Sequence, residues 1–174
     1  MSATPSTTAP YRRPTPAVPP APVRTAYALW LTAVAAGAFE TVLAVGRTAA
    51  DSSGSAGEIG TGLAVRLTVF TLAVLIARRM RGGARWARVA LALGLGVLGT
   101  ASMVVQPLAY LADGGSLTQA LSRAGAPDLV FAGSRIVHVA AVLAAVALMF
   151  RPAANAWFRR AGRGVTVGSG TDTA

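Results

Sequence analysis

Four long apolar segments dominate the chain and leave few choices for its fold. They cover residues 26–45, 61–77, 87–105 and 129–150. Each is continuous rather than alternating with polar residues, and each approaches the length of about 20 residues that an α-helix needs to cross a bilayer. A soluble chain of 174 residues that is 53% hydrophobic and only 13% charged could not enclose so much apolar surface. The sequence therefore predicts an all-α, four-helix transmembrane bundle.

The rest of the composition excludes several kinds of site. The chain has no cysteine, so it has neither a disulfide framework nor a thiolate nucleophile or metal ligand. Its one histidine, His138, leaves a histidine-based metal site short of ligands. The apolar segments contain no aspartate, no Ser-His-acid spacing and no nucleotide-binding fingerprint. We therefore expect a non-enzymatic protein with no catalytic residue, no metal and no cofactor.

The basic residues lie mostly at the ends of the apolar segments. Twelve of the 16 lie before the first segment, in the turn that runs from the second segment into the first residues of the third, or after the fourth. Because arginine favours the cytoplasmic side, we expect a multi-pass protein of the cell (inner or plasma) membrane with cytoplasmic N- and C-termini. The same placement disfavours nucleic acid as a partner, despite the net charge of +10.

The chain divides into three regions. Residues 1–25 are rich in proline and predict a disordered cytoplasmic tail, residues 26–150 form the transmembrane domain, and residues 151–174 form a basic cytoplasmic tail. A cleaved signal peptide is disfavoured by the length of the first apolar run and by Glu40 inside it. In the loop 106–128, Ser116 and Gln119 have capping-box spacing. They predict a short amphipathic helix on the membrane surface, with a lid over the bundle as the alternative.

Four ionisable residues inside the spans lie at matching depths. With a rise of 1.5 Å per residue, Glu40, Arg66 and Arg135 are each about 8–9 Å from the non-cytoplasmic ends of their segments. His138 is three residues beyond Arg135 and lies on nearly the same helix face. Ionisable groups inside a membrane are costly and usually face the bundle interior. We therefore predict one intramembrane polar layer of Glu40, Arg66, Arg135 and His138.

Three hypotheses for this layer stay open. In the first, Glu40 pairs with Arg66, Arg135 or both, and the ion pairs fix the helix packing of a structural or accessory membrane component. A stripe of small residues, Ala33, Ala36, Gly37 and Ala44, supports an inward-facing Glu40. In the second, the layer is the anion or proton site of a small transporter or channel subunit, with His138 as the titrating group. Arginines that reach toward the membrane surface without any partner are a third possibility.

Arginine and tryptophan cluster at the predicted cytoplasmic interface. The residues in question are Arg78, Arg79, Arg81, Arg85, Trp86, Arg88, Trp157, Arg159 and Arg160. Arginine binds anionic headgroups and tryptophan prefers the membrane interface, so we interpret these residues as membrane-interface anchors. The lipid bilayer, with its anionic headgroups, is thus the expected partner. In the third segment, Ala92, Gly96 and Thr100 form a row of small residues suited to helix contact, including contact across a homo-oligomer or with a membrane partner.

The basic glycine turn that leads into Arg85-Trp86-Ala87-Arg88 and an apolar helix resembles small, uncharacterised four-helix integral membrane proteins of high-GC bacteria. The proline-rich lead into Val23-Arg24-Thr25-Ala26 and Leu29-Trp30 is similar to theirs as well. This resemblance covers two short stretches and the general architecture. It implies a multi-pass inner-membrane protein, and it transfers no catalytic residue.

Overall fold

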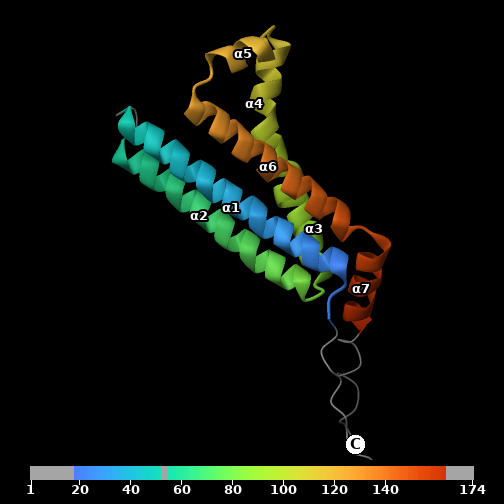
Figure 1. Ribbon diagram of the computed structural model, residues 1–174. Coiled ribbons are helices and arrows are strands. Elements are labelled where there is room, and N and C mark those ends of the chain that lie inside the picture. Colours follow the sequence, from blue (N-terminus) through green and yellow to red (C-terminus); the bar gives the residue numbers. More distant parts are fainter. Residues whose placement is uncertain (1–17, 52–54, 164–174) are drawn as a thin grey trace, which may run out of the picture.

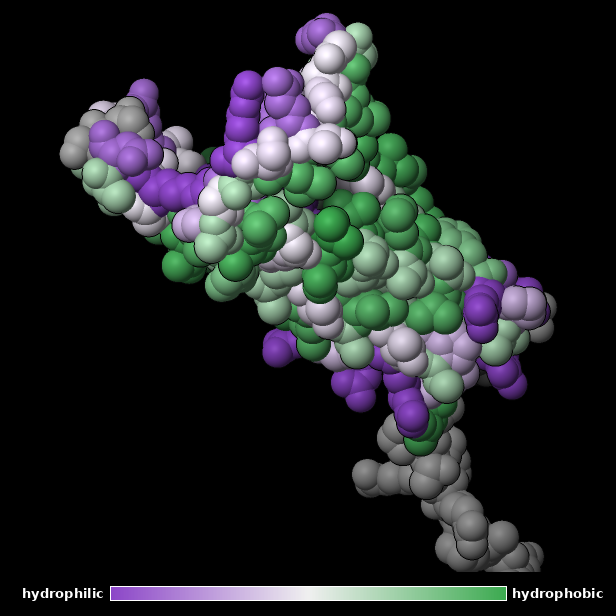
Figure 2. Space-filling model, turned by 45° about the horizontal axis from the view of Figure 1, so that its top comes forward, coloured by the Kyte–Doolittle hydropathy of each residue, from purple (hydrophilic) through white to green (hydrophobic). Residues whose placement is uncertain are grey.

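The computed structural model describes residues 18–51 and 55–163, and this part of the chain contains helices and no strand. Four of its helices are long and apolar enough to cross a membrane: α1 (Ala21–Ala50), α2 (Ala56–Arg81), the continuous helix Arg85–Ala112, and α6 (Ala126–Met149). Figure 2 shows hydrophobic residues gathered in the middle of the visible face and hydrophilic residues toward its two ends. The four-helix prediction is confirmed, and the architecture is that of a multi-pass membrane protein.

Three of the spanning helices extend at both ends beyond the apolar segments that predicted them, and α6 begins earlier than its segment. α1 begins at Ala21, inside the predicted tail of residues 1–25, of which residues 1–17 lie outside the described part. α2 begins at a capping box. The hydroxyl of Ser55 accepts a hydrogen bond from the backbone N–H of Glu58 at 3.2 Å, and the carboxylate of Glu58 accepts one from the N–H of Ser55 at 3.0 Å. Hydropathy marks the membrane core, whereas caps such as this one decide where a helix begins.

The third span is built from three pieces, α3 (Arg85–Leu91), the π-helical segment η1 (Ala92–Gly99) and α4 (Thr100–Ala112). It continues past the predicted end at residue 105, with Pro107 inside α4. Gly96 lies in η1 where that segment meets α6. A Cβ atom at Gly96 would lie 3.0 Å from Cγ2 of Val146, so the missing side chain permits a close approach. The predicted small-residue row thus makes a contact within the chain.

The two ends of the helix bundle differ in structure (Figure 1). α1 packs along both α2 and α6, and α4 diverges from α6 until α5 (Leu117–Arg123) connects the two helices. The start of α1, the α2–α3 turn and α7 (Pro152–Arg163) share one end of the molecule. We call this the arginine-rich end, because it carries Arg24, Arg78, Arg79, Arg81, Arg85, Arg88, Arg151, Arg159 and Arg160. The other end, with α5, is called the open end.

The hydrophobic core lies in the half of the bundle next to the arginine-rich end. Its largest fully buried side chains are Trp30, Phe158, Met80, Leu91, Met149 and Val23. Toward the open end burial falls away: no residue between 56 and 72 of α2 is buried, and none of α4 is. The bundle therefore has a packed half and an open half, and these names are used below.

The region predicted as a basic tail from residue 151 contains the helix α7, which packs on the bundle, while residues 164–174 lie outside the described part. Ala154 and Phe158 of α7 are buried in the core. Gly83, in the α2–α3 turn, has a φ of 93°, and a Cβ there would lie 2.5 Å from that of Ala161. A glycine is needed at this position both for its backbone conformation and for the approach of α7.

The short helix predicted in the loop 106–128 is present as α5, with Ser116 as its N-cap residue. The predicted capping box is absent, since the Ser116 side chain makes no cap hydrogen bond.

Candidate binding site in the open half

The four residues of the predicted polar layer lie at similar distances from the open end. Glu40 is ten residues before the end of α1, Arg66 is ten residues after the start of α2, and Arg135 is nine after the start of α6. At 1.5 Å per residue these positions are about 14–15 Å along their helices, and His138 is about 18 Å along α6. The matching of depths therefore holds for the full helices as well as for the apolar segments.

The nearest charged or titratable partner of Glu40 is His138. Nδ1 of His138 lies 3.4 Å from Oε1 of Glu40, and these side chains are only 14% and 9% exposed. Neither atom makes a hydrogen bond, so the two groups are in close contact without hydrogen-bonding geometry. Among the described residues no ion pair joins Glu40 to an arginine. The structure thus puts His138 where the first sequence hypothesis expected Arg66 or Arg135.

The direction of the side chains explains this pairing. In a helix the Cα–Cβ bonds tilt toward the N-terminus. α2 and α6 start at the open end, and their arginines lean that way: Nη1 of Arg66 lies 3.6 Å from the place of a Cβ at Gly62, and the Arg135 guanidinium lies 5.6 Å from the ring centroid of Phe131. α1 runs in the opposite direction, so Glu40 leans away from both.

Gly37, one turn before Glu40, lets three helices meet at this level. A Cβ atom there would lie 3.0 Å from Cε1 of His138 on α6 and 3.0 Å from Cε1 of Phe70 on α2. Gly37 is buried, as is Ala33 one turn earlier. The small-residue stripe of α1 therefore brings the imidazole of His138 close to the α1 backbone.

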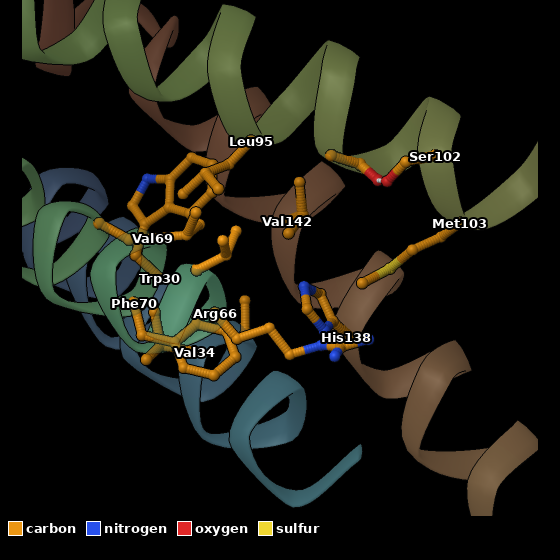
Figure 3. A pocket seen from close by; sticks show the side chains of 14 residues that line it. Trp30, Val34, Arg66, Val69, Phe70, Leu95, Ser102, Met103, His138 and Val142 are labelled. Atoms are coloured by element: carbon orange, nitrogen blue, oxygen red, sulfur yellow. Dashed lines mark hydrogen bonds between the residues drawn. The ribbon is translucent and has the colours of Figure 1, made fainter. Parts of the chain in front are cut away.

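A cavity of about 250 Å³ lies at the centre of the bundle, between all four spanning helices (Figure 3). Arg66 and His138 line it, and the Arg66 side chain extends from α2 toward the side of the cavity that carries His138. Trp30 closes the cavity toward the packed half, where its indole N–H donates to the Met149 sulfur at 3.5 Å. The labelled lining residues are Trp30, Val34, Arg66, Val69, Phe70, Leu95, Ser102, Met103, His138 and Val142.

A second space of about 430 Å³ lies between α1 and α2 nearer the open end. Thr48, Glu58 and Arg66 are among its lining residues, so Arg66 borders both spaces. The carboxylate of Glu58 is occupied by the Ser55 cap. Among the described residues Arg66 has no ion-pair partner, and its charge is free to meet an anion that enters from the open end.

Arg135 is separated from Arg66 and His138. It lines a groove between α4, α5 and α6 instead of the central cavity. Arg47, near the open end of α1, forms an ion pair of 2.9 Å with Asp128 and lies 5.8 Å from the ring centroid of Phe131, against which Arg135 also stacks. The predicted layer is therefore divided between two different spaces.

Two of the predicted membrane anchors bind protein groups. Arg85 Nε donates to the carbonyl of Phe158 at 2.9 Å, and its Nη2 donates to the carbonyl of Arg159 at 3.2 Å. Arg88 Nη1 donates to the carbonyl of Met149 at 3.4 Å and to the side-chain oxygen of Asn155. Arg88 thus holds the corner between α6 and α7, where Asn155 is a participant that no sequence signal indicated, and Arg85 holds the second half of α7.

The other predicted anchors differ in exposure. Arg78, Arg79, Arg81, Arg159 and Arg160 are exposed, as is Trp86 at 59%. Trp157 is partly buried, and its Nε1 would lie 3.5 Å from a Cβ at Gly83. Exposed side chains at this end are free to meet headgroups, whereas Trp157 is held by the turn.

Within residues 18–51 and 55–163 no group of three His, Asp or Glu side chains is arranged to hold a metal ion. Comparison of the chain with protein-family models, curated proteins and solved structures finds no match.

Proposed function

We propose that this protein is a non-enzymatic component of the cell membrane that binds a small anionic group in its central cavity. The observation that carries the proposal is the position of Arg66. Arg66 lines a cavity to which all four spanning helices contribute, and it has no carboxylate partner among the described residues. An arginine in this setting favours phosphate, sulfate or carboxylate, which accept paired hydrogen bonds from its planar fork.

His138 supplies the second polar group of the site. Its imidazole lines the same cavity, and the Glu40 carboxylate lies behind it at 3.4 Å from Nδ1. An imidazole N–H is a hydrogen-bond donor, so His138 supplies a second donor beside a bound anion. In this arrangement Arg66 binds the anion directly, and Glu40 acts through His138.

The site is closed toward the packed half. The packed half below Trp30 is filled by large side chains, among them Leu91, Met149 and Phe158. This geometry favours a binding subunit or carrier over an open channel. The arginine-rich end, with α7 and the start of α1, would face the cytoplasm by the positive-inside rule, and the cavity would then open to the opposite side.

Quenching of Trp30 fluorescence by iodide tests the proposal, because iodide is both an anion and a quencher. The chain has three tryptophans, so a Trp86→Phe/Trp157→Phe background leaves Trp30, which lines the cavity, as the reporter. We expect iodide to quench Trp30, inorganic phosphate to protect it, and Arg66→Gln to weaken iodide quenching about threefold or more. Neutral acrylamide should quench the parent and Arg66→Gln equally.

Arg123→Gln is the matched control, since Arg123 is an exposed arginine near the same end that lines neither space. It should leave iodide quenching unchanged. If acrylamide fails to reach Trp30, the cavity is dry and the proposal is wrong. It is also wrong if iodide quenching is indifferent to phosphate or to Arg66→Gln.

A further inference from the structure

The groove between α4, α5 and α6 is an apolar hollow with a volume of about 730 Å³. This volume falls within the range of about 300–1,000 Å³ that is usual for small-molecule sites. The groove is separate from the central cavity, although Met103 lines both. Its walls are almost entirely aliphatic and include Met103, Val104, Leu129, Ile136, Val139 and Leu143.

α5 covers the groove at the open end. Leu117, Ala120, Leu121 and Ala124 line it and recur at helical spacing, whereas Thr118 and Gln119 do not line it. α4 and α6 diverge beneath this helix, as Figure 1 shows. The groove is therefore bounded by three helices, with its apolar length along α4 and α6 and with α5 as its cover at the open end.

One unneutralised cation interrupts the apolar wall. Arg135 lines the groove, its Nε is buried without a hydrogen-bond partner, and no ion pair joins it to a carboxylate among the described residues. Asp128, at the mouth, is already paired with Arg47 at 2.9 Å. An unpaired arginine is costly inside a membrane. An anionic group from outside the chain would therefore stabilise Arg135 in this groove.

We propose that the groove binds one anionic phospholipid of the leaflet at the open end. An acyl chain lies along α4 and α6 beneath α5, and the phosphate meets Arg135. The position of Arg135 suits this role: it is about 14 Å along α6, and its side chain bends back over Phe131 toward the open end. A phospholipid combines the long apolar part that the aliphatic walls require with the negative charge that Arg135 requires.

This site lies outside the central cavity and does not depend on the anion site proposed there. Arg66 and His138, the residues of that site, do not line the groove. The two proposals can therefore fail separately.

Native mass spectrometry of the delipidated full chain in detergent tests the lipid site. Phosphatidylglycerol and phosphatidylcholine with identical acyl chains serve as probes. We expect phosphatidylglycerol to bind as a single tight adduct, and Arg135→Gln to weaken it about tenfold or more, to the level of phosphatidylcholine. Ala120→Phe, which fills the groove from α5, should weaken both lipids.

Two controls match these variants in charge and in bulk. Arg123→Gln removes an exposed arginine of α5, and Thr118→Phe adds a ring to the same helix outside the groove. Neither should change lipid binding. The proposal is overturned if the two lipids bind equally, if Arg135→Gln or Ala120→Phe behaves like its control, or if glycerol phosphate without acyl chains competes as well as the lipid.

Discussion

Arginine has different surroundings in the two halves of the bundle. In the packed half, Arg88 donates to the Met149 carbonyl and to Asn155, and it stacks 4.7 Å and 4.9 Å from the ring centroids of Phe150 and Phe158. In the open half, Arg66 and Arg135 border cavities and have no carboxylate partner among the described residues.

The difference lies in the acceptors rather than in the arginines. At the corner between α6 and α7, the carbonyl of Met149, the last residue of α6, has no partner within its own helix and accepts from Arg88. No helix terminus lies beside the middle of α2 or α6, where the backbone carbonyls are used within each helix. An arginine there needs an acceptor from outside the chain. Arg85 and Arg88 of the packed half therefore stabilise the fold, whereas Arg66 and Arg135 of the open half are available for ligands.

The largest expected effect is on the packed half. Arg88→Gln removes the hydrogen bonds to Met149 and Asn155 together with both stacking contacts. We expect the free energy of unfolding in detergent to fall by about 2–4 kcal/mol, because four partly buried interactions are lost together. Arg78→Gln, at an exposed arginine of the same end, should change it by less than about 0.5 kcal/mol. Equal losses in the two variants would mean that Arg88 is a headgroup anchor, and the contrast between the halves would fail.

A smaller effect should mark the level at which close packing ends. Gly37→Leu would place a side chain against His138 and Phe70, each 3.0 Å from the new Cβ. Overpacking of this kind costs about 1–3 kcal/mol. Gly46→Leu is the matched control on the same helix, since nothing lies within 4 Å of a Cβ there. Thermal unfolding of both variants should show a loss at Gly37 and none at Gly46, and a loss at both would contradict the open packing of the outer half.

The fold was predictable because the bilayer sets it. Hydrocarbon thickness fixes the length of a spanning helix, and the lack of water forces each segment to satisfy its own backbone, so hydropathy alone located the four spans. α7 was missed because only Ala154 and Phe158 of a basic segment enter the core. The role of Arg85 and Arg88 was missed because most of their acceptors are backbone carbonyls, which leave no trace in the sequence.

The candidate site was predicted in part. The rise per residue placed Glu40, Arg66, Arg135 and His138 at similar depths, and the helix bounds put them about 14–18 Å from the open-end termini of their helices. The rise per residue gives the positions of Cα atoms only and does not include the tilt of side chains toward the helix N-terminus. On the antiparallel pairs α1–α2 and α1–α6 the tilt carries Glu40 away from both arginines, and His138, three residues beyond Arg135, becomes its partner. The depth of each residue along its helix and the direction of its side chain, considered together, would have predicted the contact between Glu40 and His138.

The smallest expected effect distinguishes the two possible partners of Glu40. A double-mutant cycle of Glu40→Gln with His138→Gln should give a coupling energy of about 0.5–1.5 kcal/mol, because the two side chains are in contact at 3.4 Å. The parallel cycle of Glu40→Gln with Arg135→Gln should give less than about 0.5 kcal/mol, since no ion pair joins these residues. Both cycles are measured by unfolding in detergent. A larger coupling to Arg135 would restore the structural ion pair and would place an arginine of the open half among those that stabilise the fold.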